Sequence, residues 1–291
     1  MAEFRHYSEG DYDTVCEFFV RMNAEDRTHI NWNWARFEWM MWHPEFDKSS
    51  SGSFGLWTED GRVVAAAVYD MYFGEAFCGV LPGYDHLYPE VLDYAYRELK
   101  DDAGLGIALC DGYDREAAEL LNAGFVPAEQ TETVMRLELD RVLKADLPDG
   151  LRFTEPDPPK ESVALQWLFW QGFDHGEDRM EFEKTIDWEK RDRIHFNRDL
   201  NVAAIDGEDR FVAYCCVWYL RDTDYAYVEP VCTIPSWRGK GVGKAVVYEA
   251  LNRAASMGAK RAYVISDQKF YEKLGFVKDT HYTFFWKKED H

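Results

Sequence analysis

The chain has 291 residues, and its 33 basic and 54 acidic side chains give a formal net charge of −21. A protein this acidic is a poor candidate for binding nucleic acid or an anionic membrane surface. Its 46% hydrophobic content fits packed domains and excludes a disordered or collagen-like chain. The longest apolar run, residues 211–220, is shorter than the ~18 residues of a membrane span. The first residues contain no apolar signal core, so we expect a cytoplasmic protein.

The cysteines and histidines show no metal-binding pattern. The six cysteines form no Cys-x-x-Cys pair, and the eight histidines form no His-Glu-x-x-His motif. We therefore predict reduced, mostly buried thiols and no metal site. The acidic charge is uneven, because residues 1–149 carry 12 basic and 30 acidic side chains while residues 150–291 carry 21 and 24. Only the second half is suited to an anionic ligand.

Three landmarks recur along the chain at nearly constant separation. Gly-Phe-Val occurs at 124–126 and at 275–277, and an apolar strand reaches a proline at Pro82 and again at Pro235. Short strand patterns open each half at residues 4–7 and 151–154. The spacing predicts two copies of one domain of about 145 residues, at 1–145 and 150–291. The turn signal Leu147-Pro148-Asp149-Gly150 marks the joint between them.

The second copy predicts strands and helices in the order β-α-α-β-β-β-α-β-α-β, a mixed α/β fold with a central sheet flanked by helices. The expected strands are 151–154, 201–205, 210–220, 225–234, 262–265 and 282–287. The expected helices are 158–172, 183–194, 242–257 and 268–273. Two prolines favour the start of the first helix, and Gly258 ends the third.

A glycine-rich loop joins the strand 225–234 to the helix 242–257. Its sequence is Arg238-Gly239-Lys240-Gly241-Val242-Gly243-Lys244. Glycines let the backbone approach a ligand closely, and the free N–H groups at a helix start bind phosphate oxygens. Three basic side chains add positive charge, so the pattern predicts a pyrophosphate site. The alternative is a glycine-rich turn with solvated basic residues. The spacing fits neither a P-loop nor a dinucleotide fingerprint.

The spacing Arg-x-x-Gly-x-Gly at Arg238, Gly241 and Gly243 resembles the acyl-coenzyme A loop of the GNAT superfamily of N-acetyltransferases. Residues 229–235 resemble the central splayed strand of that family, and Tyr271-Glu272-Lys273-Leu274-Gly275-Phe276 resembles its late motif. The resemblance implies two tandem GNAT-like domains and transfer of an acetyl group from acetyl-CoA to an amine. The acceptor class, a small molecule or a peptide, stays open, and no oligomeric state is predicted.

The resemblance also implies roles for particular residues. The backbone from Gly239 to Lys244 would hold the pyrophosphate, and the backbone of Val231, Cys232 and Thr233 would pair with the pantetheine arm. Tyr271 matches the family's acid that protonates the leaving thiolate, with a core tyrosine as the alternative. Glu229 is a candidate general base, or else a strand carboxylate paired with a basic residue. The asparagine that many members use to bind pantetheine is missing, and Ser266 or Asp267 could replace it.

The first copy lacks these features. Its corresponding loop, residues 81–90, has one glycine, two acids and no Arg or Lys, and Leu120 stands where Tyr271 stands in the second copy. We therefore expect residues 1–145 to be a degenerate copy, which either has a structural role or forms one wall of the acceptor site. Trp32, Trp39 and Trp42 are expected to share a helix face, either as core or as part of an acceptor pocket. A second reading of the whole chain is a non-catalytic module that senses acyl-CoA or binds a partner.

Overall fold

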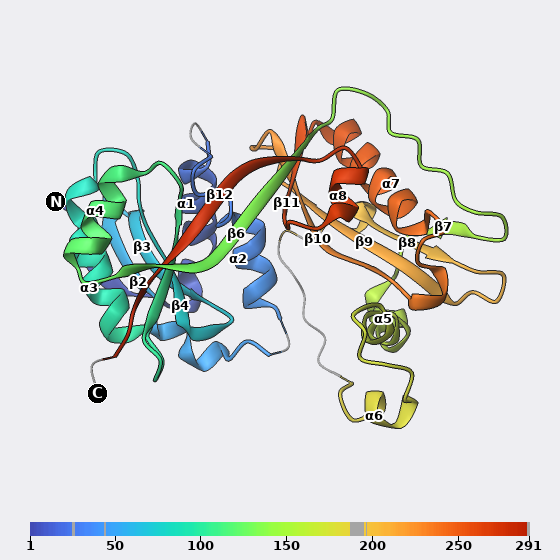
Figure 1. Ribbon diagram of the computed structural model, residues 1–291, viewed down its shortest axis with the longest axis horizontal. Helices are drawn as coiled ribbons and strands as arrows, with labels where there is room; N and C mark the ends of the chain where they lie inside the picture. The colour runs from blue at the N-terminus through green and yellow to red at the C-terminus, as the bar shows by residue number, and fades with distance from the viewer. Residues whose placement is uncertain (25–26, 44, 187–194, 196, 290–291) are drawn as a thin grey trace. The chain divides into compact units, whose positions relative to one another are not determined.

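The computed structural model describes residues 1–24, 27–43, 45–186, 195 and 197–289 (Figure 1). The chain divides into two compact units. Unit 1 comprises Met1–Met135, Ile265–Gln268 and Lys278–His291, and unit 2 comprises Arg136–Val264 and Lys269–Val277. We expected two contiguous domains, 1–145 and 150–291. The compact units differ from these because the last strand of the chain belongs to unit 1.

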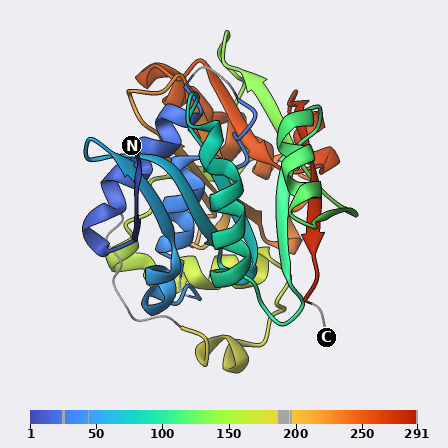
Figure 2. The same cartoon turned by 90° about the vertical axis from the view of Figure 1, so that its left-hand side faces the viewer.

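Unit 1 has a mixed sheet with helices packed on it. Its strands lie in the order β1-β2-β3-β4-β5-β12-β6. Within β3, residues from Val63 to Tyr69 are all buried, as expected for a central strand covered on both faces. The helices α1 and α3 pack against β3 (Figure 2). The strands are β1 (Glu3–His6), β2 (Gly55–Glu59), β3 (Arg62–Asp70), β4 (Tyr72–Val80), β5 (Leu105–Cys110), β6 (Val126–Glu138) and β12 (Val277–Lys287). The α-helices are α1 (Tyr12–Met22), α2 (Trp34–Met41), α3 (Tyr88–Glu98) and α4 (Asp114–Asn122).

The last strand, β12, completes the sheet of unit 1. It pairs antiparallel with β5, from Tyr282 opposite Cys110 to Lys287 opposite Leu105. The N–H of Asp111 also donates to the carbonyl of His281, at 2.9 Å. A strand edge without a partner leaves a row of N–H and C=O groups unpaired, so this pairing satisfies one edge of β5. Two chain segments about 170 residues apart therefore fold together.

We expect Gly104→Ala to destabilise unit 1 strongly, because Gly104 lies where β12 passes. A Cβ there would stand 2.1 Å from the carbonyl oxygen of Lys287, and φ is +118°. The clash and the backbone strain together predict a loss of about 3 kcal/mol or more in the free energy of unfolding. Urea denaturation measures it. Gly52→Ala is the matched control, because nothing lies within 4 Å of its Cβ position, and an equal effect of the two changes would contradict this pairing of β5 with β12.

The strands of unit 2 lie in the order β11-β10-β9-β8-β7, with the end of β6 beside β11. All positions of β9 after Phe211 are buried, and both α5 and α7 pack against this strand (Figure 1). The strands are β7 (Arg152–Thr154), β8 (Asn201–Ile205), β9 (Phe211–Tyr219), β10 (Tyr225–Thr233) and β11 (Arg261–Ile265). The α-helices are α5 (Pro158–Gly172), α6 (Arg179–Glu183), α7 (Val242–Met257) and α8 (Lys269–Lys273).

The structure confirms most of the predicted elements of the second copy and corrects two details. The prediction of a helix at 183–194 is wrong for residues 184–186, because α6 ends at Glu183 and these three residues are not helical. Asp178 starts this short helix by accepting from the N–H groups of Met180 and Glu181. Residues 187–194 lie outside the described residues. The last strand is also longer than predicted, since it begins at Val277.

In unit 1 the three tryptophans do not share a helix face. Trp32 precedes α2, because the Asn33 side chain caps that helix by accepting from the N–H groups of Ala35 and Arg36. Trp42 follows the last residue of the helix. All six cysteines are free and buried, which confirms the prediction that they are mostly buried.

Candidate functional site

In unit 2 the two parallel strands β10 and β11 separate after a short stretch of pairing. Their register covers Tyr225–Tyr227 of β10 and Arg261–Tyr263 of β11. Beyond Tyr227, β10 continues to Thr233 in pairing with β9 on its other side. One edge of β10 from Val228 to Thr233 thus lacks a ladder partner in β11, among the residues that the structure describes. This edge can accept an extended ligand as an added strand. Val231, Cys232 and Thr233 all lie on it.

Glu229 lies at an irregularity in β10. The register between β10 and β9 shifts between Val228 and Val231, so a β-bulge contains this residue. The Tyr227 hydroxyl donates to Glu229 Oε2 at 2.5 Å, and the Trp218 indole N–H donates to the Glu229 carbonyl at 2.7 Å. Glu229 is half-buried, so the side chain combines a fixed position with access to solvent.

The glycine loop leads into the N-terminus of α7. Gly239 and Gly241 have φ of +73° and +85°, which only glycine adopts readily, and nothing lies within 4 Å of either Cβ position. Gly241 is the N-cap of α7, with no side-chain cap. The first N–H groups of the helix therefore remain available for an anion. Gly243 makes a close contact, since its Cβ would stand 2.9 Å from Thr233 Oγ1.

The loop cations differ in their surroundings. Lys240 Nζ lies 4.8 Å from the centre of the Trp237 ring, and Lys244 Nζ lies 5.1 Å from the centre of the Tyr248 ring. Both lysines are exposed, and neither forms an ion pair with a carboxylate in the described part of the chain. The Arg238 guanidinium, in contrast, already donates to Asp174, Thr233 and Gly172. Lys240 and Lys244 are thus the side chains of this loop with positive charge to offer an anion.

Tyr271 belongs to the short helix α8 and is 8% exposed. Its ring packs edge-on against Phe270 and Phe276, with ring centres 5.0 and 5.5 Å apart. Phe270 in turn lies about 3.5 Å from the Cβ position of Gly243, so α8 packs beside the start of α7. Burial raises the pKa of Tyr271 well above its usual value, and the nearby Cys215 and Glu229 raise it further. The phenol therefore keeps its proton near neutral pH.

The thiol of Cys232 is not a nucleophile at neutral pH. It is 4% exposed, and burial raises its pKa to about 12. Gly172 at the end of α5 approaches it closely, because a Cβ on this glycine would stand 2.7 Å from Cys232 Cβ. The role predicted for Cys232 concerns its backbone, and nothing in this packing opposes that role.

Two residues of this site were not found from the sequence. Tyr227 contacts Glu229, and Asp174 contacts Arg238. An alternating strand pattern identifies Tyr227 as a core residue, but it does not indicate a hydrogen bond to the carboxylate two positions later. Asp174 follows a helix end at φ +64°, and the sequence holds no signal of its partner 64 residues away. Ser266 and Asp267 are grouped with unit 1, where Ser266 Oγ accepts from the N–H of Gln268.

Unit 1 also has two neighbouring parallel strands, and aromatic side chains follow their pairing. Its parallel strands β4 and β5 pair at Glu75 and Ala76. Phe77 follows directly, and its ring lies 5.7 Å from the ring of His29, which in turn lies 6.3 Å from that of Tyr113 after β5. The rings of Phe19 and Trp32 complete this aromatic cluster. Aromatic side chains therefore pack around β4 just beyond its pairing with β5.

The start of α3 in unit 1 also differs from the start of α7. Leu87, its N-cap, has an ordinary helical backbone and is the last residue of the 3-10 turn Asp85–Leu87. Asp85 pairs with Arg115 at 2.6 Å. The helix start thus carries an ion-paired carboxylate where α7 carries glycines and lysines.

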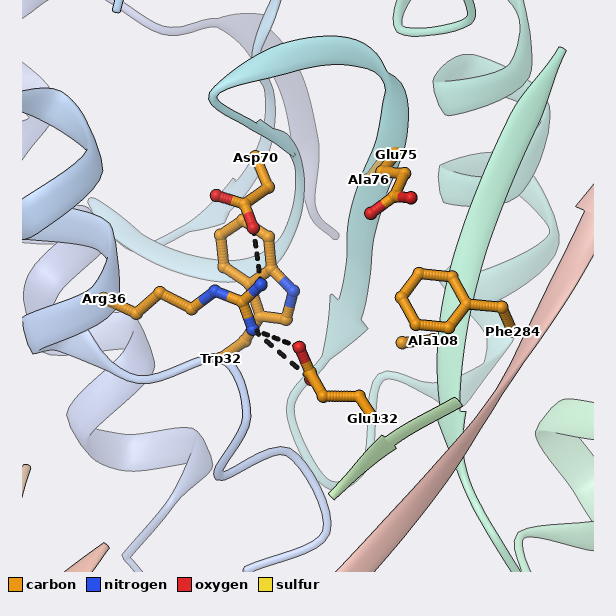
Figure 3. Close-up of a pocket in the computed structure, with 8 residues that line it drawn as sticks. All are labelled: Trp32, Arg36, Asp70, Glu75, Ala76, Ala108, Glu132 and Phe284. Atoms are coloured by element: carbon orange, nitrogen blue, oxygen red, sulfur yellow. Dashed lines mark hydrogen bonds and ion pairs between the residues drawn. The ribbon is translucent and has the colours of Figure 1, made fainter. Parts of the chain in front are cut away.

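A pocket of unit 1 is lined in part by the guanidinium of Arg36 (Figure 3). Arg36 donates to Asp70 at 2.5 Å and to Glu132 at 3.2 and 3.4 Å, and its guanidinium lies 5.0 Å from the centre of the Trp32 ring. The single guanidinium contacts two carboxylates and balances the charge of one of them. The pocket is lined by Trp32, Arg36, Asp70, Glu75, Ala76, Ala108, Glu132 and Phe284. Of the three tryptophans considered above, Trp32 therefore lines a pocket and is also nearly fully buried.

The part of the chain that the structure describes contains neither a metal-ligand cluster nor a membrane-spanning helix. There, no group of three or more His, Cys, Asp or Glu side chains is arranged to hold a metal ion. Across the same residues, no helix has the length and apolar character to cross a bilayer.

The comparisons with known proteins agree with this geometry. Residues 162–276 match the model of the Acetyltransferase (GNAT) family. The chain also resembles solved structures over its whole length. A GCN5-related N-acetyltransferase from Sphaerobacter thermophilus matches with a TM-score of 0.59 and 15% identity, over 99% of this chain and 95% of that one. A tandem GNAT protein from the clavulanic acid biosynthesis pathway matches with a TM-score of 0.64 and 13% identity, over 99% and 98%.

No curated protein matches this sequence. Residues 162–276 carry the GNAT acetyltransferase family's signature, and the chain as a whole has the tandem GNAT fold. The family match covers most of unit 2 from α5 to α8, including the glycine loop. The predicted fold class is therefore confirmed, and the predicted family is confirmed for residues 162–276. The two solved structures, at 15% identity or less, support the fold alone.

Proposed function

We propose that the chain is an acetyl-CoA-dependent N-acetyltransferase with one active site, which lies in unit 2. The observation that carries the proposal is the coincidence of an open β10 edge with an uncapped, glycine-rich start of α7. The edge suits the peptide-like pantetheine arm, and the helix start suits the pyrophosphate. Lys240 and Lys244 would add charge for the phosphates.

The proposed reaction gives each reacting group a role. The amine nitrogen attacks the thioester carbonyl carbon, and the carbon–sulfur bond breaks. A backbone N–H among Val231, Cys232 and Thr233 would stabilise the oxyanion that develops. The nitrogen gives up a proton to Glu229, directly or through water, and the leaving thiolate takes one from Tyr271. Tyr227 holds the Glu229 carboxylate in place.

Unit 1 is proposed to bind no coenzyme and to serve a structural role. The rings around Phe77 occupy the region beyond the β4–β5 pairing, and α3 starts without a glycine loop. Leu120 is fully buried in α4, so no phenol is present at the position that corresponds to Tyr271. The acceptor would be a primary amine on a small molecule or peptide.

The test is a transfer assay with the full chain. Acetyl-CoA is incubated with a panel of polyamines, aminoglycosides, amino acids and short peptides, and the free thiol released is measured against a no-enzyme blank. We expect amine-dependent thiol release and an acetylated product by mass spectrometry. Tight acetyl-CoA binding without transfer to any amine would instead support a non-catalytic sensor of acyl-CoA.

A further inference from the structure

Arg238 forms four hydrogen bonds within unit 2. Its Nε donates to the carbonyl of Thr233 at 3.0 Å, and Nη2 donates to the carbonyl of Gly172 at 2.8 Å. Nη1 donates to both carboxylate oxygens of Asp174, at 2.8 and 3.0 Å. All three guanidinium nitrogens therefore have acceptors, and the charge is matched by one carboxylate. Charge-assisted bonds of this kind are among the strong ones in proteins.

These contacts join three parts of the site. Thr233 is the last residue of β10, at the open edge, and Gly172 is the last residue of α5. Asp174 stands two residues beyond α5. The carbonyl of a helix end carries partial negative charge, which a guanidinium complements. Packing between the same parts is already close, because a Cβ on Gly172 would clash with Cys232. Arg238 thus connects the end of β10 and the glycine loop to the end of α5.

We infer that Arg238 is a positioning residue for the coenzyme site, with Asp174 as its obligatory partner. Its guanidinium holds the end of β10 and the first residue of the glycine loop against α5. The pyrophosphate is then bound by backbone N–H groups and by Lys240 and Lys244. This inference rests on the proposed function. It differs from the sequence-based prediction, in which Arg238 adds positive charge at the pyrophosphate site.

The positioning role and a direct phosphate contact predict opposite effects of removing the carboxylate. Asp174→Ala leaves a net positive charge beside the loop. If Arg238 contacted phosphate, freeing its charge would leave acetyl-CoA binding unchanged or strengthen it. If Arg238 positions the loop, losing Asp174 weakens binding although the local charge has become more positive. Since both side chains are partly exposed, we expect a loss of about five- to tenfold.

The experiment is a double-mutant cycle on the full chain, with acetyl-CoA as the probe in calorimetric titrations at two salt concentrations. Asp174→Ala and Arg238→Gln should each weaken binding about five- to tenfold, and the double variant should lose little more than the worse single variant. The acetyl-CoA affinity of Arg238→Gln should depend on salt as strongly as that of the wild type. Lys240→Gln and Lys244→Gln should each reduce this salt dependence. Arg210→Gln is the matched control, because Arg210 pairs with Asp206 in an exposed hairpin and should not affect binding.

Tighter or unchanged binding by Asp174→Ala, or additive losses in the double variant, would overturn the inference. If the wild type does not bind acetyl-CoA, the proposed function fails instead. The connection made by Arg238 is then tested by the urea unfolding midpoints of the wild type, the two single variants and the double variant. Non-additive shifts would support the connection between β10 and α5, and additive shifts would contradict it.

Discussion

Gly241→Asp is expected to abolish acetyl-CoA binding, with an affinity loss of at least about 100-fold. The carboxylate would stand at the N-cap of α7, where the proposed pyrophosphate lies, and two charges ~4 Å apart repel by about 4 kcal/mol at an effective dielectric of 20. Backbone strain at φ +85° adds to the effect. Isothermal titration calorimetry of the folded variant measures the loss.

The control for this change is Gly83→Asp in unit 1. Gly83 also has a positive φ, of +89°, with nothing within 4 Å of its Cβ position, so the substitution introduces the same charge and similar strain. It lies in the loop of the first copy that corresponds to the glycine loop. Unchanged binding by Gly83→Asp together with lost binding by Gly241→Asp would assign the coenzyme to unit 2. The reverse pattern would assign it to unit 1 and refute our proposal.

Tyr271→Phe is expected to lower kcat roughly 100-fold or more while acetyl-CoA binding stays within a few-fold of the wild type. The change removes the proton donor for the leaving thiolate and keeps the ring that packs against Phe270 and Phe276. Steady-state kinetics with the best amine and calorimetry with acetyl-CoA separate the two effects.

Tyr248→Phe is the matched control for the phenol. The Tyr248 hydroxyl donates to the carbonyl of Leu274 at 3.0 Å, so this variant loses a packing hydrogen bond next to α8 without losing the proposed acid. Equal kcat losses in the two variants would mean that Tyr271 acts through packing alone. Because burial raises the pKa of Tyr271, its phenol stays protonated as pH rises through 7 to 9. Activity over that range should therefore not fall through ionisation of Tyr271.

The local elements of unit 2 could be predicted because each has a strong local signal. The prolines at 158 and 159 and the glycine at 258 mark helix ends, and α5 and α7 have the predicted bounds. The glycine loop was also identifiable, since spacing and charge occur in one short segment. The failure at 183–194 has a local cause as well, because Asp178 starts the helix earlier and α6 ends at Glu183.

Long-range relations could not be predicted in the same way. Nothing in the alternating pattern of residues 282–287 indicates that β5, from the first half of the chain, would be their partner. Likewise, Arg238 looked like a free phosphate ligand because its partners Gly172 and Asp174 are more than 60 residues away. A cation's sequence neighbours do not reveal whether its charge is already neutralised.

The most direct measurement of the central claim is the stoichiometry of acetyl-CoA binding to the wild-type chain. Calorimetric titration of the full chain gives the number of sites without knowledge of the amine. Our account predicts one site per chain, held by the glycine loop and the open edge of β10 in unit 2. Two sites would contradict the assignment of unit 1 as a degenerate copy, and no binding would contradict the proposed acetyltransferase function.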